Sequence, residues 1–100
     1  MRIESKKDIL VEQIEETLSK IERRGIPITK TYQVEMRGRT ETVYVRSRIQ
    51  ELYEQIKSLN DSDNISLLSE EFCCILSALE GIDSFRELAW RVKIILDRVG

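Results

Sequence analysis

The stretch from Lys30 to Val45 constrains the fold more than any other part of the chain. Two runs with alternating apolar and polar residues, 31–36 and 41–45, flank the sequence Arg-Gly-Arg-Thr at positions 37–40. Alternation with a period of two is typical of a strand with one buried face, and a short glycine-containing link joins antiparallel strands. The stretch therefore predicts a β-hairpin with a basic tip.

The number of loop residues decides which side chains of this hairpin share a face. An even loop brings the apolar residues of both runs to one face, whereas a three-residue loop sends Val43 and Val45 to the face opposite Tyr32. Because one face of the pair has to be buried, we expect the even loop. The buried face then carries Tyr32, Val34, Met36, Val43 and Val45, and the outward face carries Thr31, Gln33, Glu35, Thr42 and Tyr44.

The remainder of the chain has the apolar spacing of amphipathic helices. Apolar residues recur every three or four positions over about 6–24, 47–59 and 66–80, and again from 84 to the end. We expect one α+β domain over residues 1–100, in the order helix, β-hairpin, three helices. A lone hairpin is marginally stable in water, so this one has to pack on the helices or pair with a second copy in a symmetric four-stranded sheet.

Short sequence signals mark the expected helix ends. Gly25 ends the first helix, and capping boxes open the second at Ser47, with Gln50, and the fourth at Ser84, with Glu87. The polar run 60–64 is typical of a loop. It does not match a calcium-binding loop, because the position that needs glycine is occupied by isoleucine.

Composition narrows the classes of function. The chain contains no histidine, which removes the commonest general base, nucleophile partner and zinc ligand. Cys73 and Cys74 are adjacent, so they cannot bridge one another on a helix; we interpret them as packing residues, with an intermolecular disulfide or redox role for Cys73 as the alternative. Surface solvation accounts for neighbouring carboxylates such as Glu70 and Glu71. We expect no enzyme, cofactor, metal or small-molecule substrate.

The chain also lacks the marks of export or membrane insertion. No apolar run approaches the roughly 20 residues of a membrane span, and residues 1–8 lack the apolar core of a signal peptide. We therefore expect a cytoplasmic protein that does not engage a membrane.

Positive charge gathers around the hairpin although the chain has a net charge of −2. The segment 20–48 holds eight cations and three anions, whereas the rest holds eight cations and fifteen anions. Arg46 and Arg48 bracket the expected helix start, where the helix dipole opposes a cation by roughly 0.3–1 kcal/mol. We expect Arg37, Arg39, Arg46 and Arg48 to contact nucleic-acid phosphates and Thr42 and Tyr44 to contact a groove or bases; the alternative is a set of solvated surface charges.

Two partial resemblances to DNA-binding families support that expectation. The pattern Leu18-x-x-Ile21-x-x-x-Gly25-Ile26, the basic-tipped hairpin and Val43-Tyr44-Val45 before a helix resemble the second half of winged-helix domains. In that family, the helix before the wing enters the major groove and the wing tip contacts the backbone or the minor groove. Two further helices precede that helix in the family, and we expect none here. The groove-facing surface would also carry carboxylates that phosphates repel, namely Glu12, Glu15, Glu16 and Glu22.

Residues 41–79 separately resemble the strand-helix-helix unit of ribbon-helix-helix dimers. That resemblance implies a groove-facing ribbon carrying Thr42, Tyr44 and Arg46. The strong strand that precedes residue 41 departs from the family pattern, because it occupies the place where the family pairs its strands.

The last helix offers a second candidate surface. Trp90 and Ile94 fall on the side opposite its main apolar stripe, among charged residues. This pair predicts a self-association interface, and the alternative is a helix covered on both sides within one fold. The sequence favours a non-catalytic nucleic-acid-binding module, and we expect a regulatory role and a homodimer. The competing interpretation is a protein-interaction or homo-oligomeric assembly subunit that binds no nucleic acid.

Overall fold

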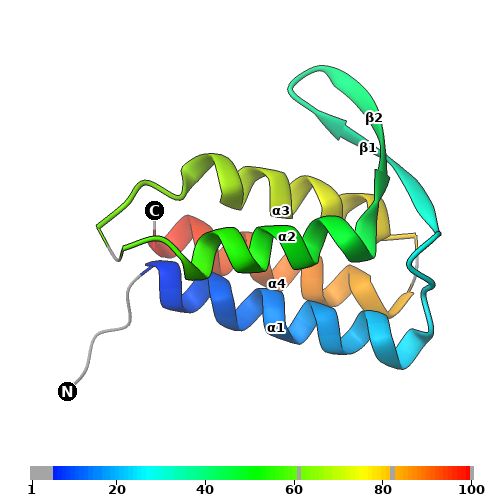
Figure 1. The fold of residues 1–100 in the computed structure, drawn as a ribbon, viewed down its shortest axis with the longest axis horizontal. Helices are drawn as coiled ribbons and strands as arrows, with labels where there is room; N and C mark the ends of the chain where they lie inside the picture. Colours follow the sequence, from blue (N-terminus) through cyan, green and yellow to red (C-terminus); the bar gives the residue numbers. More distant parts are fainter. Residues whose placement is uncertain (1–5, 61, 82, 100) are drawn as a thin grey trace.

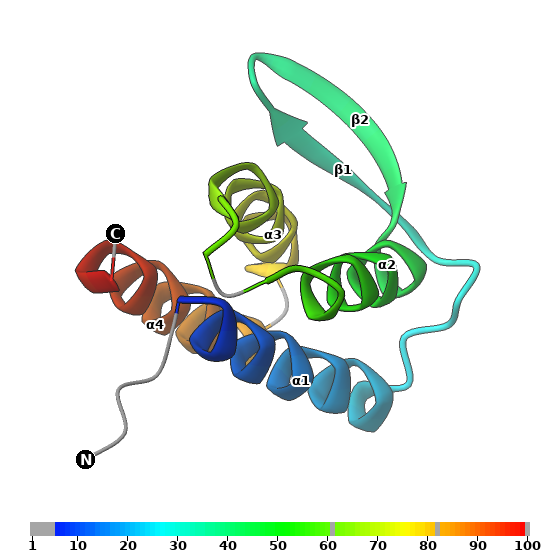
Figure 2. The same ribbon diagram turned by 60° about the vertical axis from the view of Figure 1, so that its left-hand side comes forward.

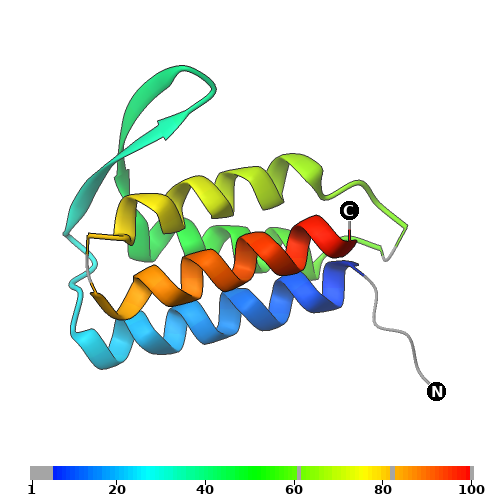
Figure 3. The ribbon, with the colours of Figure 1, turned by 180° about the vertical axis from the view of Figure 1, so that it is seen from behind.

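Four helices and one hairpin make up the part of the chain that the computed structural model describes, residues 6–60, 62–81 and 83–99. Figures 1 and 3 show the helices lying alongside one another, with the hairpin standing out at one end of the bundle. This arrangement confirms the predicted α+β order. The elements are α1 (Lys6–Arg24), β1 (Thr31–Met36), β2 (Arg39–Tyr44), α2 (Val45–Lys57), α3 (Ser66–Leu79) and α4 (Asp83–Val99).

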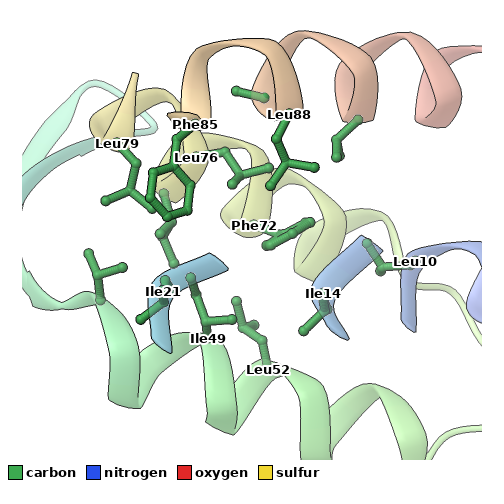
Figure 4. Packing of buried hydrophobic residues seen from close by; sticks show 14 of the residues in the cluster. Leu10, Ile14, Ile21, Ile49, Leu52, Phe72, Leu76, Leu79, Phe85 and Leu88 are labelled. Carbon is green, nitrogen blue, oxygen red and sulfur yellow. The ribbon is translucent and has the colours of Figure 1, made fainter. Parts of the chain in front are cut away.

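The core lies between the four helices, each of which turns an apolar stripe toward the others (Figure 4). The apolar stripes that the sequence predicts for the helices supply the largest buried side chains of this core. A fully buried leucine, isoleucine or phenylalanine side chain is worth roughly 1.5–3 kcal/mol of transfer free energy, so this cluster accounts for most of the fold's cohesion. It includes Leu10, Ile14 and Ile21 from α1, Ile49, Leu52 and Ile56 from α2, Phe72, Ile75, Leu76 and Leu79 from α3, and Phe85, Leu88, Ala89 and Val92 from α4.

Helix α1 ends where the sequence predicts. Gly25 adopts a left-handed φ of +69°, and the N–H of Ile26 donates to the carbonyl of Ile21 at 3.2 Å. The sequence did not reveal that α1 also buries two polar side chains. One of them, Thr17, is satisfied because its hydroxyl donates to the carbonyl of Gln13 at 2.8 Å.

The hairpin has a two-residue loop, which confirms the even register. Arg37 and Gly38 both have positive φ, 51° and 78°, as a type I′ turn requires. Met36 pairs with Arg39 next to the turn, and the ladder continues to the pair of Thr31 with Tyr44. Strand β1 packs against α3 and crosses it at an angle (Figure 2), and Val34 is fully buried; of the other apolar residues on this face, Tyr32, Met36 and Val43 are half-buried.

The predicted start of α2 at Ser47 is wrong. Strand β2 passes directly into the helix at Val45, with Tyr44 at the N-cap and no side-chain cap hydrogen bond. Val45 is fully buried, as predicted, but as the first residue of a helix rather than the last of a strand. The hairpin ladder ends at the pair of Thr31 with Tyr44, so the chain turns into the helix directly after it and Ser47 falls within the first turn rather than at the cap. The proposed cap at Ser84 lies outside the residues whose side chains are described.

Candidate binding surface around the hairpin

A groove runs between the inner face of the hairpin and the helices α2 and α3. We call it the hairpin groove, and its volume is about 410 Å³. Charged side chains of both signs line it in equal numbers, so it carries no excess of positive charge. They are Arg37, Arg39 and Arg48 against Glu41, Glu70 and Glu71, and Met36 and Cys74 complete the lining.

Arg48 is the most firmly held of the predicted phosphate contacts. Its Nη2 donates to Oε1 of Glu71 at 2.7 Å and its Nε to the other oxygen of the same carboxylate, while Nη1 reaches Glu51 at 2.8 Å. The hydrogen bonds to Glu71 are the main reason that the pKa of Arg48 lies above its ordinary value. Glu71 is therefore not a solvated surface carboxylate, as the sequence suggested, and this pairing offsets the helix-dipole cost at Arg48.

The two arginines at the hairpin tip are held more loosely. Arg37 Nε lies 3.8 Å from Glu70, and the two side chains are 62% and 51% exposed. Arg39 Nη2 lies 3.0 Å from Glu41, with the arginine 78% exposed. Exposed pairs of this kind contribute about 0–1 kcal/mol, so both arginines can exchange their partners at little cost. A sequence signal existed for the second pair, because residues two apart on a strand share a face.

The other predicted contact residues lie elsewhere. Arg46 Nη1 donates to the carbonyl of Ile26 at 3.0 Å, so it ties α2 to the segment that follows α1. Thr42 and Tyr44 lie on the outer face of the sheet, where Gln33 Nε2 donates to the Thr42 hydroxyl at 2.9 Å. The six residues expected to bind nucleic acid are thus divided between the groove, the outer face and the base of the hairpin.

Cys74 is a protected thiol rather than a reactive one. It is half-buried at the edge of the groove, and burial is the main reason that its pKa is raised, with Glu70 and Glu71 adding to the effect. A thiol with a raised pKa stays protonated near neutrality and is a poor nucleophile. Cys73 is likewise free and half-buried. Its intermolecular disulfide or redox role stays a prediction.

The outer edge of β2 has unpaired backbone groups. In a two-residue hairpin the residues beside the loop exchange both backbone hydrogen bonds, so residues 39, 41 and 43 bond across to β1. The N–H groups of Thr40, Thr42 and Tyr44 point the other way. Within the described residues, no backbone hydrogen bond of a turn, loop or helix cap involves the N–H groups of 39–44. We call this row of groups the β2 edge.

Large apolar side chains are exposed at both candidate interfaces. Tyr44, at the end of the β2 edge, is 56% exposed, and Ile28, in the segment leading into β1, is 60% exposed. On α4, Trp90 is 65% exposed beside Glu80, Arg86 and Glu87, whereas Ile94 is half-buried. The self-association interface predicted at Trp90 and Ile94 stays a prediction.

Comparisons of the chain with protein-family models, curated proteins and solved structures find no match. Within the described ranges no group of three or more histidine, cysteine, aspartate or glutamate residues is placed to hold a metal ion. Nor is any described helix both long and apolar enough to cross a bilayer.

Proposed function

We propose that the protein is a non-catalytic protein-interaction module and that the β2 edge is the strand through which it binds. The observation that carries this proposal is the row of outward N–H groups on a six-residue strand, with the exposed ring of Tyr44 at its end. An unpaired edge of this kind accepts an extended segment of another chain as an additional strand, and main-chain hydrogen bonds supply the affinity.

The charges around the hairpin favour a protein partner over a nucleic acid. A polyanion is attracted by a net positive surface, whereas the hairpin groove balances three arginines with three glutamates. Arg48 is engaged by a half-buried carboxylate and Arg46 by a backbone carbonyl, so neither is free for a phosphate without losing that partner. An exposed strand edge that ends at the exposed ring of Tyr44 has no such requirement for charge.

Affinity capture with edge variants tests the proposal. Thr42→Pro removes an N–H that points away from β1, so it blocks the β2 edge without breaking the hairpin ladder. Gln33→Pro is the matched control, because the N–H of Gln33 likewise points away from β2. We expect proteins from the source cell, this chain included, to be retained by the wild type and Gln33→Pro and lost with Thr42→Pro. Retention that is equal on all three proteins would refute the proposal.

Nucleic-acid binding is the second candidate, and the exposed tip supports it. Arg37 and Arg39 project from the turn, and their ion pairs are weak enough for phosphates to displace the glutamates. Figure 1 places this tip away from the helical bundle, where a duplex can approach it.

A fluorescence-polarisation titration separates the two candidates. Duplex and single-stranded DNA and RNA are titrated at low and moderate salt against the wild type, Arg37→Ala/Arg39→Ala and Lys6→Ala/Lys57→Ala. The last variant removes the same charge at the other end of the bundle. Nucleic-acid binding predicts an affinity that falls with salt and weakens selectively in the tip variant. The protein-interaction proposal predicts no binding that depends on the tip.

A further inference from the structure

The β2 edge is complementary to itself. Two copies can pair antiparallel so that Thr42 lies opposite Thr42 of the other copy and Thr40 lies opposite Tyr44. In this register each outward N–H of Thr42 and Tyr44 meets a carbonyl of the second copy, which gives about four backbone hydrogen bonds. From this match we infer that the occupant of the β2 edge is a second copy of this chain, and that the product is a four-stranded sheet. The inference rests on the proposed function, because it names the partner for the same edge.

The side chains of the outer face fit the same register. Tyr44 lies opposite Thr40 on both sides of the two-fold axis, and an aromatic residue opposite a β-branched one is a favourable cross-strand pair. At the axis itself the two Thr42 hydroxyls face one another. Each has an O–H that it can donate across the interface, whether or not its oxygen also accepts from Gln33 of the same chain.

Two other registers that keep the sheet faces aligned are poorer. A pair centred on Glu41 places that carboxylate directly opposite its own copy, which is destabilising. A pair centred on Thr40 moves the second copy's turn, at Gly38, opposite Thr42 and leaves the N–H of Tyr44 without a carbonyl. The register centred on Thr42 avoids both defects.

Charge complementarity also permits two copies to meet. The inner face of β2 carries Arg39 and Glu41, which already form an ion pair at 3.0 Å within one chain. The charges of Arg39 and Glu41 therefore cancel within each strand β2. Joining two such strands brings no excess of positive or negative charge to the interface. A strand with charges of a single sign would resist such pairing.

The expected dimer is weak. One strand-to-strand contact buries less surface than the ~1,600 Å² of a standard stable interface. We therefore expect a dissociation constant of about 10–1,000 µM for the dimer. Each tenfold change in that constant corresponds to ~1.4 kcal/mol of binding free energy.

Engineered cysteines test the register in a background that carries Cys73→Ser and Cys74→Ser. Facing residues of such a pair have Cα atoms ~5.5 Å apart, within the range that a disulfide spans. Under mild oxidation we expect Thr42→Cys to form a covalent dimer. Thr40→Cys and Tyr44→Cys should cross-link when mixed but not separately. The control Gln33→Cys, on the other strand, should stay monomeric. Cross-linking that is equal at all four positions would contradict the register.

Sedimentation over protein concentrations from 10 µM to 1 mM tests the dimer without cysteines. We expect the wild type and Gln33→Pro to associate with rising concentration and Thr42→Pro to remain monomeric. A wild type that stays monomeric at 1 mM overturns the inference, as does a dimer that survives Thr42→Pro and is lost in Trp90→Ala. If other proteins are still captured through Thr42 while the chain stays monomeric, only the second copy is excluded. If neither measurement responds to Thr42→Pro, the proposed function fails as well.

Discussion

The helical bundle and the hairpin are held in place by different means. Every helix contributes several fully buried side chains to one core, whereas the two six-residue strands bury only Val34. The hairpin instead depends on a tight turn, on that single anchor and on the half-buried side chains of Tyr32, Met36 and Val43. The bundle therefore supplies most of the stability, while most of the hairpin stays exposed.

The largest test of this contrast compares the two kinds of anchor. Phe72→Ala empties the centre of the bundle and should lower the free energy of unfolding by about 3–5 kcal/mol. Val34→Ala removes a smaller side chain at the edge of the core and should cost roughly 1–3 kcal/mol. Urea denaturation followed by far-ultraviolet circular dichroism measures both losses. Equal losses would mean that the hairpin is as integral to the core as the bundle.

The second test compares two ion pairs of the hairpin groove. Arg48→Met leaves the half-buried Glu71 without its bidentate partner, so we expect a loss of about 1–3 kcal/mol. Arg37→Met removes the same charge from an exposed pair and should cost below about 1 kcal/mol. A double-mutant cycle with Glu71→Gln and Glu70→Gln isolates the two coupling energies. A coupling for Arg37 as large as that for Arg48 would contradict the distinction.

The third test concerns the turn. Gly38 has a φ of +78°, so Gly38→Ala forces a side chain into the left-handed region at a cost of roughly 1–2 kcal/mol. Gly81→Ala is the control, because Gly81 lacks a positive φ and an added Cβ would contact nothing within 4 Å. The midpoint temperature of thermal unfolding should therefore fall for Gly38→Ala and stay unchanged for Gly81→Ala. An equal shift would show that the turn conformation is not what matters.

The smallest expected effect is a gain in stability. Arg37 is a non-glycine residue with a φ of +51°, and asparagine tolerates that region better than arginine does. Arg37→Asn should raise the free energy of unfolding by a few tenths of a kcal/mol, about 0.3–0.5, although it gives up the exposed pair with Glu70. Thermal unfolding of Arg37→Asn, compared with that of the control Arg39→Asn, measures the gain. A decrease would mean that the Glu70 pair is stronger than its geometry indicates.

Local signals in the sequence predicted most of the fold. Gly25 marked the end of α1, and the alternation around Arg37 and Gly38 fixed the hairpin register through its parity. Local reasoning failed where a distant contact decided the outcome. The start of α2 follows the last strand pair, between Thr31 and Tyr44, rather than the capping pattern at Ser47.

The site was predicted less completely, because pairing depends on the fold. Nothing near Arg48 in sequence indicates Glu71, 23 positions away, and the same is true of Arg37 and Glu70. The basic character of the segment was visible, but its neutralisation by α3 was not. The free β2 edge was foreseeable in principle, since a two-stranded sheet always leaves an outer edge on each strand.

The junction at Tyr44 has a mechanical consequence. This residue ends β2 and caps α2, with no loop between them. Its N–H faces the open edge, while its C=O is the acceptor for the first turn of the helix. A chain that docks on the edge therefore fixes the backbone angles of Tyr44, and the same constraint stiffens the beginning of α2. Occupancy of the hairpin is thus transmitted into the bundle through one residue, where slower deuterium uptake at the first amides of α2 would report it.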